Sequence, residues 1–322
     1  MGENILNSND FVLLTGTANL SLSQKIALIL KKDLNESVSV FSDGEIRIRI
    51  PINLRRRIVY IIQPTPAKVN DNIMELILLI DAAKRASAKE VVAIIPYFGY
   101  SRQDRKEMPR VPISASVIAS MVEHAGADRI VTIDIHSEQQ EGFVQKPWDN
   151  LYSSYSLLPE IKKRKLSNLI VASPDKGGVT RATGYAKLLG AEGIAIVYKE
   201  RDITLNNKSE AMAMVGNVQN KDVLLVDDML DTGGTIVNAA SYIKQKGARS
   251  VRVAVTHGLF SGQAINKINK SIIDEVIVTD TVSLKDEIMN SPKITVVSVA
   301  PLLAEAIKRI QTGESISEDL IL

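Results

Sequence analysis

Short runs of Val, Ile and Leu alternate along this chain with longer stretches of helical period. Because each run is apolar throughout, it predicts a parallel strand that is covered by helices on both faces. The alternation therefore predicts an α/β fold, with mainly parallel sheets flanked by helices and with ligands at the carboxyl ends of the strands. The six runs are Val91 to Ile95, Ile130 to Ile135, Leu169 to Ala172, Ile194 to Val197, Val223 to Val226 and Val251 to Val255.

One pattern, a helix followed by a Gly-Ala turn and a strand that ends at a histidine, occurs twice. It runs from Ser114 to His136 and again, without a gap, from Thr235 to His257. The match predicts two similar lobes, although any two α/β units share these features. A break in periodicity near Leu151 to Pro159 marks the expected boundary. The predicted domains are residues 1–152 and 153–300, with a terminal helix within 301–322 packed on the first.

Composition is that of an ordinary globular protein, with 45% hydrophobic and 24% charged residues among 322. The net charge of +2 excludes a global field that recruits nucleic acid or an anionic membrane. The absence of cysteine excludes disulfides and cysteine zinc sites, and fits a cytoplasmic location. No signal peptide is expected, and the apolar stretch Ile73 to Ala83 is too short and too charged to span a membrane.

The segment Asp227 to Thr235 follows a predicted strand and opens a predicted helix. Its glycines let backbone N–H groups approach an anion, and the helix N-terminus adds positive potential. Three aspartates beside a phosphate would repel it unless they served hydroxyls or a metal, so the ligand is expected to be a sugar phosphate. A simple helix cap explains only one of the three. The predicted contacts are Asp227, Asp228, Asp231, Thr232, Gly233, Gly234 and Thr235.

A second loop of the same kind, Ser173 to Arg181, also lies between a predicted strand and a helix. Gly177 and Gly178 free backbone donors for an oxyanion, and Lys176 adds a cation. Asp175 is expected to order magnesium-bound water around a diphosphate. An ordinary turn is the alternative, which a second such loop makes less favourable.

A third loop, Pro96 to Lys106, is aromatic and basic. Arg102 and Gln103 are suited to stack on a purine or to bind its edge, although the loop alone is also typical of a solvated basic surface. His136 ends a fourth strand beside Asp134, and a lone histidine is more often structural than a ligand.

The segment from Tyr198 to Asp202 carries two cations, Lys199 and Arg201, after another strand. Ile203 to Ala211 has no firm periodicity, so the region is interpreted as a mobile lid that closes over phosphates and neutralises transition-state charge. An exposed charged loop is the alternative. The sequence contains no P-loop and no protein-kinase motif set. It also contains no Gly-x-Ser-x-Gly element and no zinc-spaced histidine cluster.

Taken together, these motifs resemble those of the ribose-phosphate diphosphokinase family, the phosphoribosyl pyrophosphate synthetases. The likeness spans nearly the whole chain, whereas the aspartate-rich loop alone is shared with phosphoribosyltransferases. Further matching segments are Phe41 to Glu45, Asn72 to Leu76, Arg85 to Lys89, Thr256 to Gly262 and Pro301 to Ala306.

The resemblance implies two phosphoribosyltransferase-like domains that transfer the β,γ-diphosphoryl group of ATP to the C1 hydroxyl of ribose 5-phosphate, with Mg²⁺. It implies a homo-oligomer, a hexamer with ATP sites between subunits. Lys199 and Arg201 become the catalytic cations, and Arg201 also a ribose 5-phosphate contact. The remaining implied roles are ATP binding by Asp43, Gly44, Glu45, Arg102 and Gln103, a diphosphate loop of Asp175, Lys176, Gly177 and Gly178, and metal binding by His136 and Asp175.

Departures from the family pattern limit what is carried over. Gln145 stands where an acid is common, so a second metal site is in doubt, although Asp149 is present. Glu107 to Pro109 is less basic than usual, so phosphate activation and nucleotide inhibition are not predicted. A silent regulatory relative and a base-transferring phosphoribosyltransferase remain the alternatives, and AMP formation from ATP distinguishes both.

Overall fold

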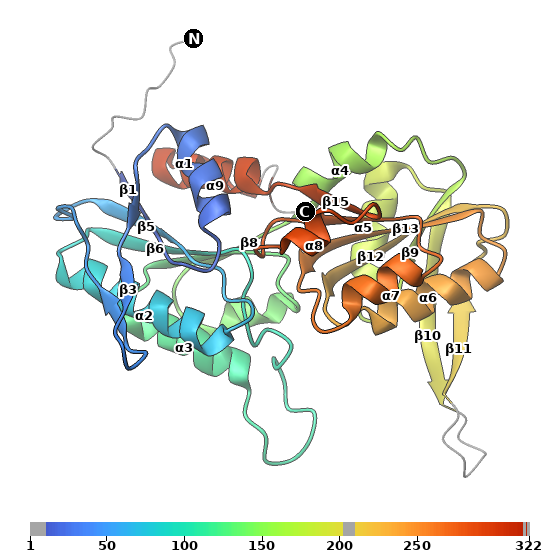
Figure 1. Ribbon diagram of the computed structural model, residues 1–322, viewed down its shortest axis with the longest axis horizontal. Helices are drawn as coiled ribbons and strands as arrows, with labels where there is room; N and C mark the ends of the chain where they lie inside the picture. The colour runs from blue at the N-terminus through green and yellow to red at the C-terminus, as the bar shows by residue number, and fades with distance from the viewer. Residues whose placement is uncertain (1–10, 202–209, 318–319, 321–322) are drawn as a thin grey trace. The chain divides into compact units, whose positions relative to one another are not determined.

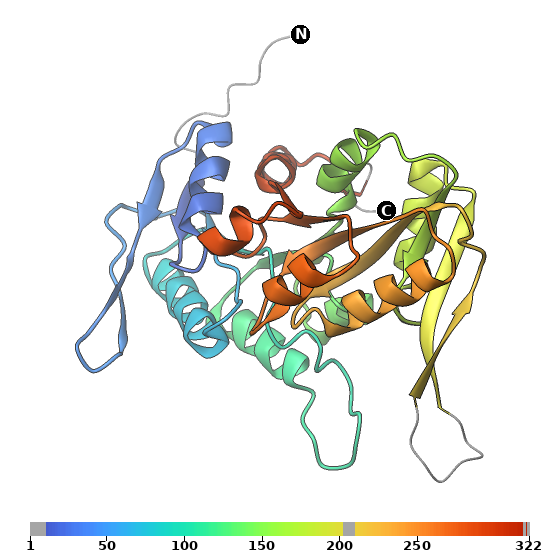
Figure 2. The same ribbon diagram turned by 45° about the vertical axis from the view of Figure 1, so that its right-hand side comes forward.

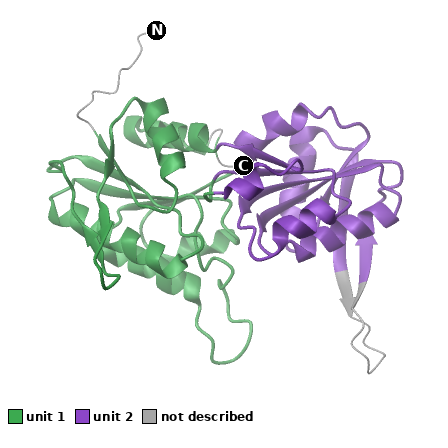
Figure 3. Cartoon of the chain, in the orientation of Figure 1, with its two compact units in different colours: residues 1–152, 281–283, 299–321 green, residues 153–280, 284–298, 322 purple. Residues whose placement is uncertain are grey.

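The computed structural model describes residues 11–201, 210–317 and 320, without the side chains of residues 199–201, 210 and 211. The chain forms two compact units, which Figure 3 draws in different colours. Unit 1 comprises residues 1–152, 281–283 and 299–321, and unit 2 comprises 153–280, 284–298 and 322. Each unit has a mainly parallel sheet, so the predicted fold class is confirmed. Within the described ranges, no helix has the length and apolarity that crossing a membrane requires.

Unit 1 contains a six-stranded sheet with the strand order β2-β1-β5-β6-β7-β8. All its strand pairs are parallel, and β3 and β4 form a separate antiparallel hairpin. The strands are β1 (Phe11–Thr15), β2 (Leu34–Glu36), β3 (Val38–Val40), β4 (Ile46–Ile48), β5 (Ile58–Ile62), β6 (Glu90–Ile95), β7 (Arg129–Ile133) and β8 (Trp148–Leu151). The helices are α1 (Leu20–Leu30), α2 (Val69–Arg85), α3 (Ser114–Ala125), the short 3₁₀ helix η1 (Glu138–Phe143) and α9 (Ala300–Thr312).

Both faces of this sheet are covered, which explains why its strands are apolar at every position. Phe11 and Leu13 of β1 pack in the cluster that α1 and α9 complete on one face. Val12 and Leu14 pack on the other face, with α2 and α3 (Figures 1 and 2). The terminal helix α9 therefore belongs to the core of unit 1, although the sequence of unit 2 separates it from the rest.

Unit 2 contains a seven-stranded sheet with the order β11-β10-β9-β12-β13-β14-β15. Only the β10–β11 pair of this sheet is antiparallel. Helices α6 and α7 cover one face, and α4 and α5 cover the other. The strands are β9 (Leu169–Ser173), β10 (Gly193–Arg201), β11 (Glu210–Val215), β12 (Asp222–Leu230), β13 (Ser250–Gly258), β14 (Glu275–Thr279) and β15 (Ile294–Val297). The helices are α4 (Ser154–Lys162), α5 (Val179–Leu189), α6 (Gly234–Gln245), α7 (Ala264–Lys270) and α8 (Asp286–Met289).

Strand β12 is longer than its apolar run predicts. Pairing with β13 continues from Asp227, opposite Val255, to Leu230, opposite Gly258. The prediction that Asp227 and Asp228 follow the strand is therefore wrong, because both lie within it. Backbone pairing with a long neighbour extends a strand past the point where its side chains stop being apolar.

The expectation that Tyr198 to Asp202 follows a strand is wrong for residues 198–201, which lie within β10, whereas the role of the segment as a lid stays a prediction. Lys199 and Arg201 lie on β10, where their backbones pair with Met212 and Glu210 of β11. Strands β10 and β11 form an antiparallel pair. Its backbone hydrogen bonds could not be inferred from the charged side chains of this segment. Residues 202–209 of the predicted lid lie outside the described residues.

The predicted repeat is out of register by one βα unit. Its two copies are α3 with β7 and α6 with β13, and both Gly126 (φ 114°) and Gly247 (φ 89°) make the expected left-handed turn. The two strand orders, however, match when β2-β1-β5-β6-β7-β8 is set beside β10-β9-β12-β13-β14-β15. Strand β7 then corresponds to β14 rather than β13. The repeated pattern is the general one for a helix, a glycine turn and a buried strand.

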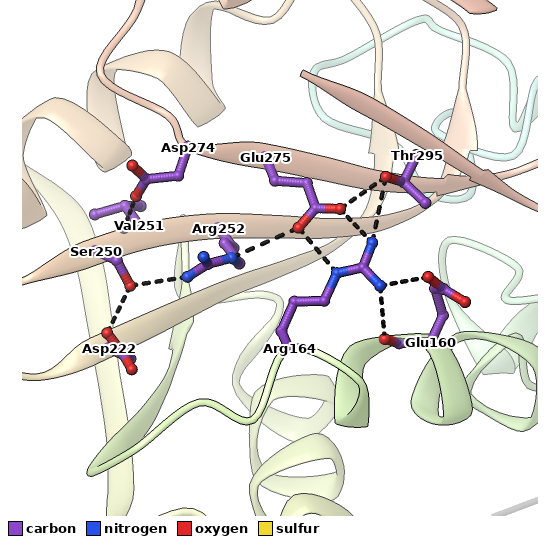
Figure 4. A network of polar contacts seen from close by, with 9 residues as sticks. All are labelled: Glu160, Arg164, Asp222, Ser250, Val251, Arg252, Asp274, Glu275 and Thr295. Carbon is purple, nitrogen blue, oxygen red and sulfur yellow. Dashed lines mark hydrogen bonds and ion pairs between the residues drawn. The ribbon is translucent and has the colours of Figure 1, made fainter. Parts of the chain in front are cut away.

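Ion pairs close the edge of unit 2 where the parallel strands begin (Figure 4). Arg164 is held between Glu160 and Glu275, with its Nε donating to Glu275 at 3.1 Å. The Asp222 carboxylate accepts from the Ser250 hydroxyl at 2.7 Å. Arg249 also pairs with Asp222, and its hydrogen bond is the largest of the effects that hold the pKa of Asp222 far below its usual value. The charged side chains named here are thus paired with one another. Groups that bind a ligand are expected at the opposite edge of the sheet, where the parallel strands end.

Candidate active site

The aspartate-rich loop spans the end of β12 and the start of α6. Gly233 precedes the helix with φ 74°, a left-handed conformation that favours glycine, and it has no side chain with which to cap the helix. Two hydrogen bonds from the segment after β13 stabilise the loop. Ser261 N–H donates to the Asp231 carbonyl at 3.0 Å, and the Lys267 ammonium donates to the Thr232 carbonyl at 3.1 Å. Thr232 and Thr235 are exposed. A helix N-terminus with exposed hydroxyls and glycine is suited to bind a phosphate.

Asp227 and Asp228 form a carboxylate pair at the end of the sheet. Their side chains are 16% and 7% exposed. Burial, followed by the neighbouring Asp228 charge, raises the pKa of Asp227 well above its usual value. Two acids so close together and so little exposed form a site that suits a cation or hydroxyl donors.

Arg181 is the charged residue that sequence reasoning left without a role. It belongs to α5, and its Nη1 lies 3.9 Å from Asp227 Oδ1 and 3.8 Å from Asp228 Oδ1. Its attraction lowers the pKa of Asp227 but is outweighed by burial and by Asp228. The only signal in the sequence was its place in the first turn after Gly177-Gly178, where it faces the neighbouring strand.

The second oxyanion loop joins β9 to α5. The Ser173 hydroxyl donates to the Asp175 carbonyl at 2.7 Å, and Gly178 N–H donates to Asp175 Oδ1 at 3.0 Å. A Cβ at Gly178 would lie 2.5 Å from Ser173 Oγ, so this turn requires glycine. The Lys176 ammonium lies 4.8 Å from the centre of the Tyr198 ring. The loop exposes Asp175, Lys176 and Gly177 to ligands.

These two loops leave adjacent strands. β9 pairs with β12 on one side and with β10, the strand of Lys199 and Arg201, on the other. The charge of Asp175 contributes to the raised pKa of Asp227. The structure thus brings the predicted sugar-phosphate and diphosphate residues of unit 2 to one edge of one sheet. The side chains of Lys199 and Arg201 lie outside the described residues.

The nucleotide residues predicted after β6 lie in an ordered turn of unit 1. Tyr100 has a left-handed φ of 65°, and Gln103 N–H donates to the Tyr100 carbonyl at 2.8 Å. Ser114 donates its hydroxyl to Gln103 Oε1 at 2.7 Å, while the side chains of Arg102 and Gln103 are exposed. The aromatic character of the loop is largely structural, because Phe98 is buried against Trp148 with ring centres 5.2 Å apart.

His136 is exposed, three residues after the end of β7. The strand stops earlier than its apolar run predicts, since Asp134 has φ 41° and turns the chain. Asn150 accepts the Ile135 N–H at 3.0 Å, and Ser101 Oγ accepts the His136 N–H at 3.1 Å. His257, which ends the second copy of the repeated pattern, is 2% exposed in unit 2.

Asp43, Gly44 and Glu45 form the turn of the β3–β4 hairpin. Gly44 has φ 97°, and Glu45 N–H donates to Asp43 Oδ1 at 3.0 Å. A cavity of about 350 Å³ lies beside Gly44 and Glu45 and reaches Asp71 and Met74 of α2. The turn is exposed.

Glu75 was part of a recognised motif, but its role was not predicted. This α2 residue is 4% exposed and accepts from the Thr17 N–H, from the Thr17 hydroxyl at 2.8 Å and from Gln63 Nε2 at 2.9 Å. A Cβ at Gly16 would lie 2.4 Å from Glu75 Oε1, so the turn encloses the carboxylate closely. In unit 1 the loop after β1 therefore binds an anion that belongs to the chain itself.

The oxygen-rich donors of unit 2 fit Mg²⁺, which prefers carboxylate and phosphate oxygens and takes only one or two carboxylates from the protein. The Asp227 and Asp228 side chains, 16% and 7% exposed and adjacent on β12, supply carboxylate oxygens of this kind. No cluster of three His, Cys, Asp or Glu side chains with metal-binding geometry occurs among the described residues. Asp149, considered for a further metal contact, is paired with Arg129.

Comparison with known proteins gives consistent results over nearly the whole chain. Residues 11–126 match the N-terminal domain of ribose phosphate pyrophosphokinase, and residues 202–320 match the phosphoribosyl synthetase-associated domain. The ribose-phosphate pyrophosphokinase of Vibrio parahaemolyticus is 48% identical over 96% of this chain and 98% of its own length. That of Wolinella succinogenes is 49% identical over 95% and 98%. The phosphoribosylpyrophosphate synthetase structure from Mycobacterium smegmatis has a TM-score of 0.89 and 36% identity, over 94% of this chain and 99% of that one.

Proposed function

The chain belongs to the ribose-phosphate pyrophosphokinase family, and from this premise we propose which residues bind each substrate and which stabilise the transition state. The enzyme makes phosphoribosyl pyrophosphate from ATP and ribose 5-phosphate. The C1 hydroxyl oxygen of the sugar bonds to the β-phosphorus of ATP, the bond from that phosphorus to the α–β bridging oxygen breaks, and AMP leaves with the oxygen. The hydroxyl proton is released.

Ribose 5-phosphate is assigned to the loop after β12. The N-terminus of α6, with Thr232, Gly233 and Thr235, binds the 5-phosphate, and Asp227 and Asp228 accept hydrogen bonds from the sugar hydroxyls. The observation that carries this assignment is the largely buried Asp227–Asp228 pair on the strand that leads into a glycine-containing helix start with exposed Thr232 and Thr235. Arg181 is assigned to hold the pair in place through its 3.8 and 3.9 Å contacts.

The diphosphoryl group is assigned to Asp175, Lys176, Gly177 and Gly178. Gly177 N–H and the Lys176 ammonium are donors for its oxygens, and Lys176 must leave the Tyr198 ring to reach them. Asp175 in unit 2 and His136 in unit 1 are each assigned to bind Mg²⁺, which would supply positive charge for the diphosphate. Lys199 and Arg201 are assigned to stabilise charge that develops on the transferring group.

ATP is assigned to Arg102 and Gln103 of unit 1, with Asp43, Gly44 and Glu45 reaching the nucleotide of a neighbouring subunit. This requires a homo-oligomer, which we propose is a hexamer. We also propose that the functional boundary lies between residues 152 and 153, with the terminal helix serving the first domain. A cytoplasmic location is proposed because the chain has no cysteine.

A coupled assay tests the reaction. The wild-type enzyme is supplied with ATP, ribose 5-phosphate and Mg²⁺, and AMP is measured while inorganic phosphate is varied. We expect AMP in equal amount to phosphoribosyl pyrophosphate, and none when ribose 5-phosphate is omitted. AMP formation that does not require the sugar contradicts the assignment of the acceptor.

Two other results would redirect the interpretation. No turnover under any phosphate concentration, with intact oligomers, would favour a regulatory subunit. Turnover with a purine base and without ATP would favour a phosphoribosyltransferase.

A further inference from the structure

Gln140 is a buried polar residue that the reaction as described leaves without a role. It lies on η1, four residues after His136, and is 0% exposed. Its partner is Ser101, which is 4% exposed and directly precedes Arg102 in the loop after β6. A buried amide requires hydrogen-bond partners, and here a single residue of another loop supplies them.

The hydrogen bonds define how the two side chains are oriented. Gln140 Nε2 donates to the Ser101 carbonyl at 3.0 Å, which places the amide nitrogen on that side. The Ser101 hydroxyl then donates to Gln140 Oε1 at 3.2 Å. The same hydroxyl oxygen accepts the His136 N–H at 3.1 Å. One serine therefore links the backbone of His136 to the side chain of Gln140.

The two loops so joined both contain residues in a left-handed conformation. Tyr100, next to Ser101, has φ 65°, and Asp134, two residues before His136, has φ 41°. Side chains other than glycine adopt this conformation at a cost, and it persists where surrounding contacts fix it. The Ser101–Gln140 pair is such a contact, since it lies between the two turns.

We propose that Gln140 and Ser101 are positioning residues for the reaction, which fix the nucleotide loop of Arg102 and Gln103 to the loop of His136. The inference rests on the proposed function, because it takes these loops to serve ATP and its metal. Gln140 does not touch substrate. It sets the place of groups that do, so its loss acts on ATP and not on ribose 5-phosphate.

The test is a comparison of Gln140→Leu with Gln24→Leu, the same chemical change on the exposed surface of α1 in unit 1. We expect Gln140→Leu to raise KM for ATP about tenfold, as when a buried donor and acceptor lose their partner, and to leave KM for ribose 5-phosphate within about twofold. Gln24→Leu is expected to change neither. Equal increases in both KM values, or none, would overturn the inference.

A double-mutant cycle tests the pairing itself. We expect the loss in the Ser101→Ala, Gln140→Leu double variant to be smaller than the sum of the two single losses, because both changes remove the hydrogen bonds between Ser101 Oγ and the Gln140 amide. Strictly additive losses would show two independent residues and would overturn the proposal. Where Gln140→Leu fails to fold, Gln140→Glu replaces it, since it keeps an acceptor for the Ser101 hydroxyl, loses the amide donor and adds an ionisable group.

Arg102→Ala separates failure of this inference from failure of the proposed function. If Arg102→Ala raises KM for ATP and Gln140→Leu does not, the positioning role is wrong and the nucleotide assignment stands. If Arg102→Ala leaves KM for ATP unchanged, the nucleotide assignment is wrong, and the inference falls with it.

Discussion

The loop after β1 in unit 1 and the loop after β9 in unit 2 occupy the same place in two sheets of matching strand order, but they satisfy their donors differently. In unit 1, Thr17 donates its N–H and hydroxyl to Glu75, which α2 supplies. In unit 2, Gly178 N–H donates to Asp175 within the same loop, and Lys176 is exposed beside it. One loop is filled by a carboxylate from elsewhere in the chain, whereas the other presents charged side chains to solvent.

The next strand of each sheet shows the same contrast. Ile58 pairs with Phe11 at the start of β1, and Asp222 pairs with Leu169 at the start of β9. Counted from these pairs, Gln63 in unit 1 corresponds to Asp227 in unit 2. The neutral amide donates to Glu75, while the acid is buried beside a second carboxylate. The comparison teaches that the fold supplies the position of an anion loop, and that single side chains decide whether a ligand is needed there.

Lys199→Ala gives the largest expected effect, because it tests whether unit 2 carries the charge of the transition state. We expect the variant to fold normally and to lose at least ~100-fold in kcat, as when a transition-state charge partner is removed. Steady-state kinetics at saturating substrates measures this. Lys187→Ala, on the exposed surface of α5, is the matched control. Near-wild-type turnover would remove Lys199 from the mechanism.

Glu75→Ala tests the opposite expectation, that the filled loop of unit 1 is structural. Thr17 and Gln63 lose a buried partner, so the free energy of unfolding is expected to fall by about 2 kcal/mol. Calorimetry measures the loss, and kinetics should give an unchanged KM for ribose 5-phosphate. Glu75→Gln retains one acceptor and should lose less. A stable variant with a raised KM for the sugar would mean that Glu75 serves the site.

Asp227→Asn gives unit 2 a neutral amide at the position where unit 1 has Gln63. Burial and Asp228 raise the pKa of Asp227, so its contribution to stability is complete below about pH 4, the ordinary aspartate pKa, and is lost as pH rises through the folded-state value. The variant should therefore be about 1 kcal/mol more stable than the wild type at pH 8, with no advantage at pH 4. Thermal unfolding across this range measures the difference.

Asp222→Asn, at the other end of β12, is the control of opposite sign. The pKa of Asp222 is lowered, first by its hydrogen bond from Arg249, so its stabilisation is present above the ordinary pKa and is lost as pH falls. This variant should be less stable than the wild type at pH 8. If both substitutions stabilise the protein at that pH, the electrostatic contrast between the two edges is wrong.

Tyr198→Leu has the smallest expected effect. It removes the ring beneath Lys176, a contact worth about 0.5 kcal/mol at an exposed site, and so changes KM for ATP by about twofold. Tyr198→Phe keeps the ring and should match the wild type. A tenfold change in Tyr198→Leu would show that the ring, and not only the lysine, is needed to hold the diphosphate loop.

Much of the fold could be predicted from the sequence because the strands are buried on both faces. All six apolar runs that define the predicted sheets overlap strands of the structure. The ends of the strands were harder to predict. Asp227 and Asp228 lie within β12, which pairs with β13, and Lys199 lies within β10, which pairs with β11. Side-chain polarity carries no information about such pairing.

The candidate site could be predicted where chemistry lies in one continuous segment. The loops at Asp175 to Gly178 and at Asp227 to Thr235 are of this kind. Contacts between segments could not be predicted: Arg181 reaches the aspartate pair from a helix, and Glu75 and Gln140 bind loops that begin elsewhere in the chain. Their residue types are ordinary for helices, and only the tertiary fold gives them partners.

The position of α9 has a consequence for synthesis on the ribosome. Leu302, Leu303 and Ala306 complete the core cluster beside α1, but they emerge only after residues 153–298 have been made. At about 5–20 residues per second, that interval lasts roughly 7 to 30 s. During it the nascent first unit exposes the apolar surface that α9 will cover, and by its end the second unit has all its strands. The unit translated first is therefore completed last. Until then the growing chain exposes apolar surface of the kind that chaperones shield.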